Sequence, residues 1–194
     1  VGLMPRNTLE GVDTSFRAAL GRLDCERRLR KVSKAVSTEH EIAGIMKTLD
    51  GGEALLFENV VGYEWPVVGN LFGSPENCEV CFDTDLKGLR QIMSGAIDRQ
   101  VPPEEGDSEV PAQQVVHTDK VDLEAMFPAL THSLADIGRF ITAGVILVRD
   151  PETGVSNASY HRLQLIGENR TAIKLDYGRH LRAALEKAQA KGAD

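Results

Sequence analysis

The stretch Thr142-Ala-Gly-Val-Ile-Leu-Val-Arg-Asp-Pro-Glu-Thr-Gly154, followed by Asn157-Ala-Ser-Tyr-His-Arg162, decides the fold of the second half of this chain. Its Pro-Glu-Thr-Gly turn separates two runs of apolar and mixed residues. Turn residues between two such runs are typical of a β-hairpin. The pattern therefore predicts that residues 139–148 pair with residues 155–166.

Beyond the hairpin, residues 171–175 are predicted to form a third strand. Apolar side chains at helical spacing then predict a final helix from Gly178 to Lys191. The helix begins with Gly178-Arg179-His180, directly after a strand. Such junctions often carry functional groups in α/β proteins.

Three polar side chains of this region suggest a chemistry: the Asn157 amide, the His180 imidazole and the Arg162 guanidinium. An amide oxygen and a neutral imidazole nitrogen can share one divalent metal ion. An arginine can hold a carboxylate or a phosphate by two parallel hydrogen bonds. From spacing alone, other roles remain open: Asn157 as a turn residue, His161 as a half-buried strand residue, and His180 as a solvent-facing one.

In residues 1–110, apolar runs bounded by glycines alternate with amphipathic stretches, which predicts an α/β domain. Thr38 and Glu41 match a capping box for the second helix. Asp83 or Thr84 is expected to cap the third. The helices are expected near residues 15–23, 41–49 and 84–99, and the strands near residues 54–61 and 66–72.

The stretch from Val101 to Pro111 is the best candidate for a linker, because it is rich in proline and acidic residues. The sequence thus predicts two domains, residues 1–110 and 111–194. After the boundary, a strand is expected near residues 113–117, and a loop of mixed polarity at 122–136.

Composition restricts the function class. The chain has 194 residues, 42% of them hydrophobic, and a formal net charge of −7. A negative chain without a Lys/Arg block among aromatics is not expected to bind nucleic acid. No apolar stretch approaches the roughly 20 residues of a membrane span, and the start shows no secretion signal. We expect a cytoplasmic protein with a small-molecule ligand and no membrane partner.

The three cysteines include a Cys78-Glu-Val-Cys81 pair. This spacing occurs in redox and zinc motifs, but the chain has no second cysteine pair to complete a zinc site. Small buried side chains are the better interpretation.

Four strings, in their order along the chain, resemble the UbiD family of decarboxylases, which use prenylated flavin mononucleotide. They are Asp136-Ile-Gly-Arg-Phe-Ile-Thr-Ala-Gly144, Asp150-Pro-Glu-Thr-Gly154, Asn157-Ala-Ser-Tyr-His-Arg-Leu-Gln164 and Gly178-Arg-His-Leu181. Matches at residues 55–62, 67–74 and 121–128 extend the resemblance over nearly the whole chain.

The resemblance implies an N-terminal α/β domain followed by a split β-barrel related to flavin reductases, of which this chain holds an incomplete first part. It implies that manganese bridges the cofactor phosphate to the protein, with Asn157 and His180 as two metal ligands and potassium often nearby. Arg162 would be the catalytic residue beside the substrate carboxylate and the flavin. The positions matching the cofactor pocket are Thr142, Ser159, Tyr160, His161, Arg162, Arg179 and His180.

The activity implied by the resemblance is non-oxidative decarboxylation of an aromatic or α,β-unsaturated acid, or the reverse carboxylation. Family members continue for a few hundred residues after the helix that ends here at Gly192. That portion carries a glutamate as the third metal ligand and two glutamates that act with the arginine. The substrate acid cannot be identified from the residues present.

Two interpretations of this difference stay open. The chain is the N-terminal half or a split subunit of a decarboxylase, completed by a complementary subunit or within a homo-oligomer. Alternatively, it is a non-catalytic module that binds a flavin, a metal or another protein. A flavin-reductase-like barrel that transfers hydride is a third interpretation, which explains Thr142 and Arg162 but gives Asn157 and His180 no joint role.

Overall fold

The computed structural model describes residues 8–99, 101 and 113–192. The chain divides into two compact units, Val1–Lys120 and Val121–Asp194. The predicted linker from residue 102 onward, and the boundary placed at residue 110, lie outside the described residues. Within those residues, no helix is both long and apolar enough to cross a membrane.

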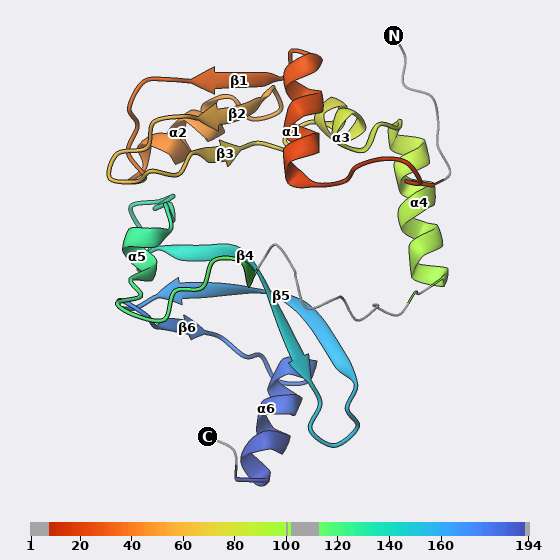
Figure 1. Cartoon of the computed structure of the whole chain (residues 1–194), viewed down its shortest axis with the longest axis vertical. Helices are drawn as coiled ribbons and strands as arrows, with labels where there is room; N and C mark the ends of the chain where they lie inside the picture. The colour runs from red at the N-terminus through yellow and green to blue at the C-terminus, as the bar shows by residue number, and fades with distance from the viewer. Residues whose placement is uncertain (1–7, 100, 102–112, 193–194) are drawn as a thin grey trace. The chain divides into compact units, whose positions relative to one another are not determined.

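The first unit is a small α/β layer (Figure 1). Its sheet has the order β1-β2-β3, with β1 parallel to β2 and β3 antiparallel to it. Helix α2 lies in the crossover that parallel pairing of β1 and β2 requires. The elements are α1 (Phe16–Cys25), β1 (Leu29–Val32), α2 (Glu41–Thr48), β2 (Ala54–Phe57), β3 (Val67–Gly69), α3 (Pro75–Phe82) and α4 (Leu86–Asp98).

The core of this unit forms around β2, whose residues are nearly all buried, as predicted for a strand covered on both faces. Helices α1 and α3 pack together against it. The buried cluster consists of Ala19, Leu23, Ala54 and Cys81. Helix α2 approaches β3 so closely that a Cβ on Gly69 would lie 2.7 Å from Met46 Cγ, which explains the glycine there.

Three local predictions were wrong in this unit. The capping box fails because the N-cap of α2 is His40, in the left-handed region, and Glu41 accepts a hydrogen bond from the Ser37 N–H instead. The α4 cap is Asp85, whose carboxylate accepts from the Gly88 N–H. Asp83 instead ends α3, a helix that was not predicted. Strand β1 was also missed.

A buried polar network ties α3 to the loops around it. Asn77 is fully buried, and its amide donates to the carbonyls of Gly52 and Asn70, both at 3.1 Å. Arg28 donates to Asn77 Oδ1 at 2.8 Å and to Ser74 Oγ at 2.9 Å. Because every polar atom of the Asn77 side chain is paired, the network fixes these loops without a desolvation penalty.

The second unit is an antiparallel sheet with a helix on it. The sheet has the order β4-β5-β6, and α6 contacts both β4 and β5. The predicted hairpin, third strand and final helix are confirmed, but the strand expected at residues 113–117 is wrong. The elements are α5 (Leu123–Met126), β4 (Phe140–Arg149), β5 (Ser156–Leu165), β6 (Thr171–Ile173) and α6 (His180–Ala190).

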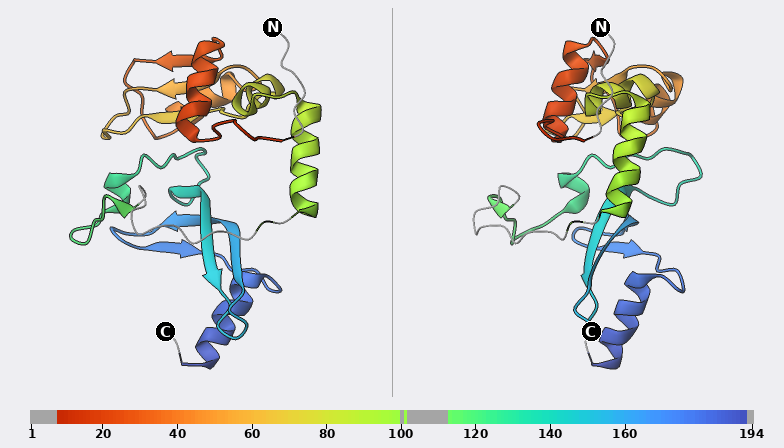
Figure 2. Two further views of the ribbon diagram at one scale, coloured as in Figure 1. Left: turned by 45° about the vertical axis from the view of Figure 1, so that its right-hand side comes forward. Right: turned by 90° about the vertical axis from the view of Figure 1, so that its right-hand side faces the viewer.

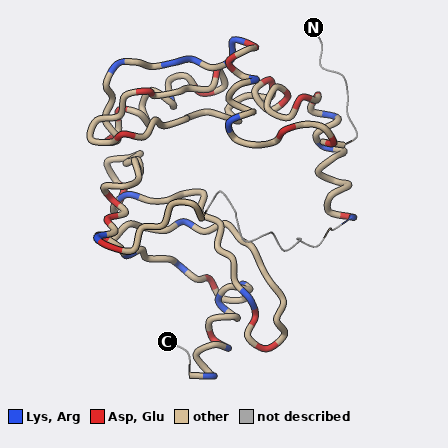
Figure 3. Tube along the Cα trace, in the orientation of Figure 1, with Lys and Arg blue, Asp and Glu red and all other residues tan. Residues whose placement is uncertain are grey.

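Two lysines of α6 hold the turn of the β4–β5 hairpin, an arrangement we call the lysine clamp. Lys187 Nζ lies 2.7 Å from Asp150 Oδ2 and 3.0 Å from Glu152 Oε2. Lys191 Nζ donates to the Pro151 carbonyl at 2.8 Å. Figure 3 shows the acidic residues at this hairpin tip, and both views of Figure 2 show α6 beside it.

The first prediction concerns the buried network. Asn77→Ala should lower the free energy of unfolding by about 3 kcal/mol, because it leaves the Arg28 guanidinium and two buried carbonyls without their partner. Urea unfolding followed by the fluorescence of Trp65, the single tryptophan, measures this change. Asn59→Ala, at an exposed position, is the matched control. Equal losses for the two variants would contradict the assignment.

The second prediction concerns the pH dependence of the clamp. The hydrogen bond from Lys187, with those from the backbone of Glu152 and Thr153, holds the pKa of Asp150 well below its usual range. The folded protein therefore takes up this proton at lower pH than the unfolded chain. The stabilisation is complete above about pH 4 and is lost as the pH falls further.

Asp150→Asn should accordingly melt at a lower temperature than the unaltered chain at pH 7, and the gap should close progressively below about pH 4. Melting curves from circular dichroism between pH 7 and pH 2.5 measure this gap. Asp119→Asn, at an exposed position, should follow the unaltered chain throughout. A gap that stays constant down to pH 2.5 would count against the clamp.

Candidate metal and cofactor site

Strand β5 separates the predicted site residues into two sets, because successive side chains of a strand point to opposite faces. Asn157, Ser159 and His161 belong to the half-buried set, on the face that α6 covers. Tyr160 and Arg162 belong to the exposed set. The site therefore has to be described one face at a time.

On the half-buried face, Asn157 and His180 are in contact although they come from β5 and α6. Asn157 Nδ2 lies 3.2 Å from His180 Nδ1. An amide nitrogen can only donate, so His180 Nδ1 accepts in this orientation. The two predicted metal ligands thus converge.

The Asn157 amide carries an unsatisfied polar atom. Its Oδ1 is buried, and no described residue donates a hydrogen bond to it. Turning the amide over would let Oδ1 accept from His180, but Nδ2 would then be the unpaired buried atom. Either orientation leaves a group whose burial is costly without a partner. A cation bound to Oδ1 and to the imidazole would satisfy it, so these residues fit a metal ion.

A hollow of about 360 Å³ lies beside this pair. Ser159 and His161 form a second polar pair in it, with Ser159 Oγ 3.0 Å from His161 Nε2. Of the predicted pocket residues, six come together here. The lining residues are Asn157, Ser159, Tyr160, His161, Asp176, Arg179, His180 and Leu181.

The start of α6 adds positive potential to this hollow. Arg179 is the N-cap, and no side chain caps the helix. The N–H groups of a first turn point outward and favour an anion, as does the helix dipole. Arg179 can add a charge-assisted hydrogen bond. An anion and a metal ion can therefore be held side by side.

Arg162 and Thr142 lie on the other face, across from each other. In the β4–β5 ladder, Ile141 pairs with Leu163 and Gly144 with His161. Thr142 and Ala143 therefore both oppose Arg162, which is a β-bulge. These residues are exposed, and the Arg162 guanidinium has no ion-pair partner among the described residues. The structure does not place Arg162 in the hollow around His180.

Sequence reasoning missed Asp176, which also lines the hollow. Its signal was its place in the loop before Gly178, and it forms an ion pair of 3.2 Å with Lys174. Across the described part of the chain, no three His, Cys, Asp or Glu side chains cluster as a metal site.

The cysteine pair behaves as structural. Cys81 is 2% exposed and belongs to the core of the first unit. Burial raises the pKa of both the Cys78 and the Cys81 thiols. A raised pKa suppresses the reactive thiolate, which favours the buried-side-chain interpretation.

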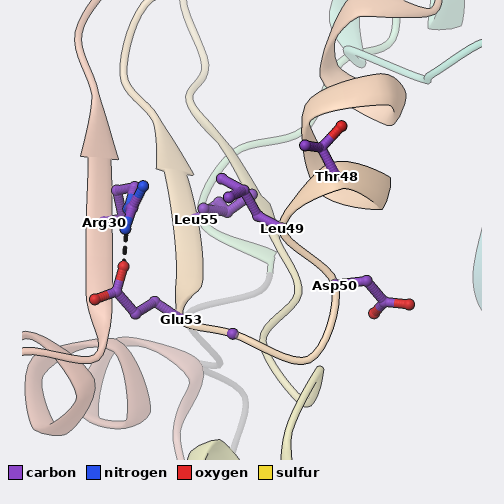
Figure 4. A pocket seen from close by; sticks show the side chains of 7 residues that line it. Arg30, Thr48, Leu49, Asp50, Glu53 and Leu55 are labelled. Atoms are coloured by element: carbon purple, nitrogen blue, oxygen red, sulfur yellow. Dashed lines mark hydrogen bonds and ion pairs between the residues drawn. The ribbon is translucent and has the colours of Figure 1, made fainter.

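The first unit has a hollow of about 310 Å³ between β1, β2 and the loop after α2 (Figure 4). Its polar side chains are paired within the unit. Arg30 meets Glu53 at 2.8 Å, and Asp50 meets Lys47 at 3.5 Å. Thr48 donates to the Gly44 carbonyl. Since no polar side chain is left for a ligand, the site on the second unit is the stronger candidate.

Comparison with known relatives agrees with this location. The chain is 38% identical over 177 residues to an uncharacterized protein in the cooM 5' region of Rhodospirillum rubrum, covering 89% of this chain and 38% of that protein. It is 32% identical over 163 residues to the anhydromevalonate phosphate decarboxylase of Methanothermobacter thermautotrophicus, covering 84% and 37%. The chain thus spans about two fifths of the length of these relatives.

A solved structure is also similar. An evolved dimeric form of the UbiD-class enzyme HmfF from Pelotomaculum thermopropionicum, in complex with prenylated flavin mononucleotide, matches with a TM-score of 0.84 and 35% identity. The match covers 93% of this chain and 42% of that one. It confirms the α/β fold with two small sheets as an N-terminal part of that architecture.

Two family models cover most of the chain. The 3-octaprenyl-4-hydroxybenzoate carboxy-lyase N-terminal domain matches residues 20–94. The Rift-related domain of the same carboxy-lyase matches residues 104–194. Together with the relatives and the fold, they show that this chain belongs to the UbiD family, of which it represents the N-terminal portion.

Proposed function

We propose that the complete protein is a non-oxidative decarboxylase, or carboxylase, of an aromatic or α,β-unsaturated carboxylic acid, with prenylated flavin mononucleotide and Mn²⁺ as cofactors. The observation that carries the proposal is the contact of Asn157 with His180, next to a buried amide oxygen that lacks a partner. The decarboxylase among the relatives and the flavin-bound structural neighbour support it.

In this proposal, the half-buried face binds the phosphate end of the cofactor. Asn157 and His180 contribute two ligands to Mn²⁺, and a glutamate from the remaining polypeptide contributes the third. Arg179 and the first turn of α6 favour the phosphate. Ser159, Tyr160 and His161 line the hollow, as predicted from the resemblance, and a potassium ion binds nearby. When bound, the flavin supplies the electron chemistry that protein side chains lack.

Arg162 has a different task, on the exposed face. A guanidinium without an ion-pair partner can hold a carboxylate by two hydrogen bonds. Thr142, opposite it at the bulge, offers a hydroxyl that donates to or accepts from the same ligand. We assign Arg162 to the substrate carboxylate and Thr142 to the flavin and substrate beside it.

The exposed face also supports a missing protein partner. Large apolar side chains gather on it, with Val145 51%, Leu147 79% and Tyr160 78% exposed. Strands β4 and β6 are edges of their sheet, and open edges favour added strands. We propose that the remaining two thirds of the family's polypeptide, in this chain or in a complementary subunit, covers this face within a homo-oligomer.

The third prediction tests the metal ligands. His180→Ala in the complete protein, produced together with a flavin prenyltransferase and purified without oxygen, should lose manganese and flavin together. Elemental analysis and the mass of the released cofactor measure both. His132→Ala, at an exposed position of the same unit, is the control. Full loading of His180→Ala would show that the ligand assignment is wrong.

The fourth prediction tests Arg162. Arg162→Ala should keep flavin and manganese but lower turnover by about 100-fold or more, because a positioned charge on the reacting carboxylate is lost. Arg149→Ala, on the exposed face at the far end of the hairpin, should retain turnover. A protein that binds flavin and metal, but removes carbon dioxide from no acid supplied, would favour the non-catalytic module.

A further inference from the structure

The geometry of the candidate metal site depends on how α6 docks on the hairpin. Asn157 belongs to β5 and His180 to α6, so a small movement of the helix separates them. The docking face of α6 is made of small residues, Ala183 and Ala184. A hollow of about 420 Å³ remains between helix and hairpin, lined by these alanines, by both candidate ligands and by Lys187. Apolar packing alone therefore constrains the helix weakly.

Polar contacts between α6 and the hairpin lie at the two ends of this hollow. At one end is the Asn157–His180 contact itself. At the other is the lysine clamp on the turn. Lys187 follows His180 by seven residues, which is two helical turns, so both lie on the same side of α6 about 10 Å apart.

The clamp holds a rigid part of the hairpin. Asp150 Oδ1 accepts hydrogen bonds from the N–H groups of Glu152 and Thr153, at 2.8 and 3.0 Å, while Oδ2 faces Lys187. The same carboxylate thus shapes the turn and receives the helix. A turn fixed in this way is a firm anchor for the far end of α6.

The beginning of α6 lacks such an anchor. The helix has no side-chain cap, and Gly178 before it has a φ of +73°, in the left-handed region. Arg182 donates to the Leu175 carbonyl and stacks on Tyr177, but both belong to the loop that leads into the helix. These contacts move with the helix and cannot fix it on the hairpin.

We propose that Lys187, through Asp150 and Glu152, is a positioning residue for the metal site, which sets α6 on the hairpin so that His180 meets Asn157. The inference rests on the proposed function, because it concerns the metal site assigned there. Lys187 itself touches neither candidate ligand in any contact of the described residues. Its effect is transmitted by the helix.

The test is a titration of the complete apoprotein with Mn²⁺, followed by the loss of the free-ion electron paramagnetic resonance signal. Lys187→Met keeps the aliphatic stem and removes the charge. It should weaken Mn²⁺ binding by about 10-fold, as changes behind a metal ligand commonly do. Lys187→Arg, which keeps the charge, should restore most of the affinity. Lys187→Gln provides the same comparison should the methionine variant not fold.

The matched control is Glu186→Gln. It breaks an ion pair of the same length, 2.7 Å, between Arg182 and Glu186, but this pair stays within α6. The control should bind Mn²⁺ as the unaltered protein does. Pulsed resonance of the bound ion adds a second measurement, since the coupling to the His180 imidazole nitrogen should weaken in Lys187→Met alone.

The outcomes separate the two proposals. An unaltered protein that binds no Mn²⁺ overturns the metal site, and the inference with it. An unaltered protein that binds Mn²⁺, with equal affinity and equal nitrogen coupling in Lys187→Met, overturns the inference alone. Loss of affinity in both Lys187→Met and Glu186→Gln shows a general effect of helix stability and also overturns it.

Discussion

The contact between Asn157 and His180 is the interaction on which the candidate site depends. The two residues are 23 positions apart and belong to different kinds of element. They meet only when β5 is registered on β4 and α6 has docked on both. A buried amide oxygen without a partner is unfavourable in the folded protein, so this corner of the structure is less stable than it would be with a ligand present. Binding and folding are therefore coupled there.

The alternation of side chains along β5 divides the chemistry between two faces. Asn157, Ser159 and His161 face α6, where metal and phosphate are favoured. Arg162 and Thr142 face away from it, among exposed apolar residues. This division agrees with a long cofactor that has a charged end and an apolar ring. It also explains why the half-site in this chain has ligands and an arginine without the acids that would act with them.

Much of the second unit could be predicted from the sequence, because its signals are local. Apolar runs around a Pro-Glu-Thr-Gly turn specify the hairpin, and helical spacing specifies α6. The contact of Asn157 with His180 could not be derived in this way, since it depends on tertiary docking. Only the family resemblance indicated it. The clamp was missed for the same reason, because Lys187 and Asp150 are 37 positions apart.

In the first unit, the errors have physical causes. Strand β1 was missed because its central residues, Arg30 and Lys31, are charged, and only pairing with distant β2 makes them a strand. Figure 3 shows these basic residues along β1. The start of α2 was mispredicted because Thr38 is buried and not available as a cap. Local patterns identify such features only when no tertiary contact competes for the same residues.

The bulge in β4 determines where this strand can change in length. Losing either Thr142 or Ala143 would leave one residue opposite Arg162, and the pairs on both sides could keep their register. Losing a residue between Val145 and Val148 would shift the ladder by one, which exchanges the two faces of the strand. Single-residue gaps among relatives are therefore expected at the bulge, whereas the rest of β4 is constrained to constant length.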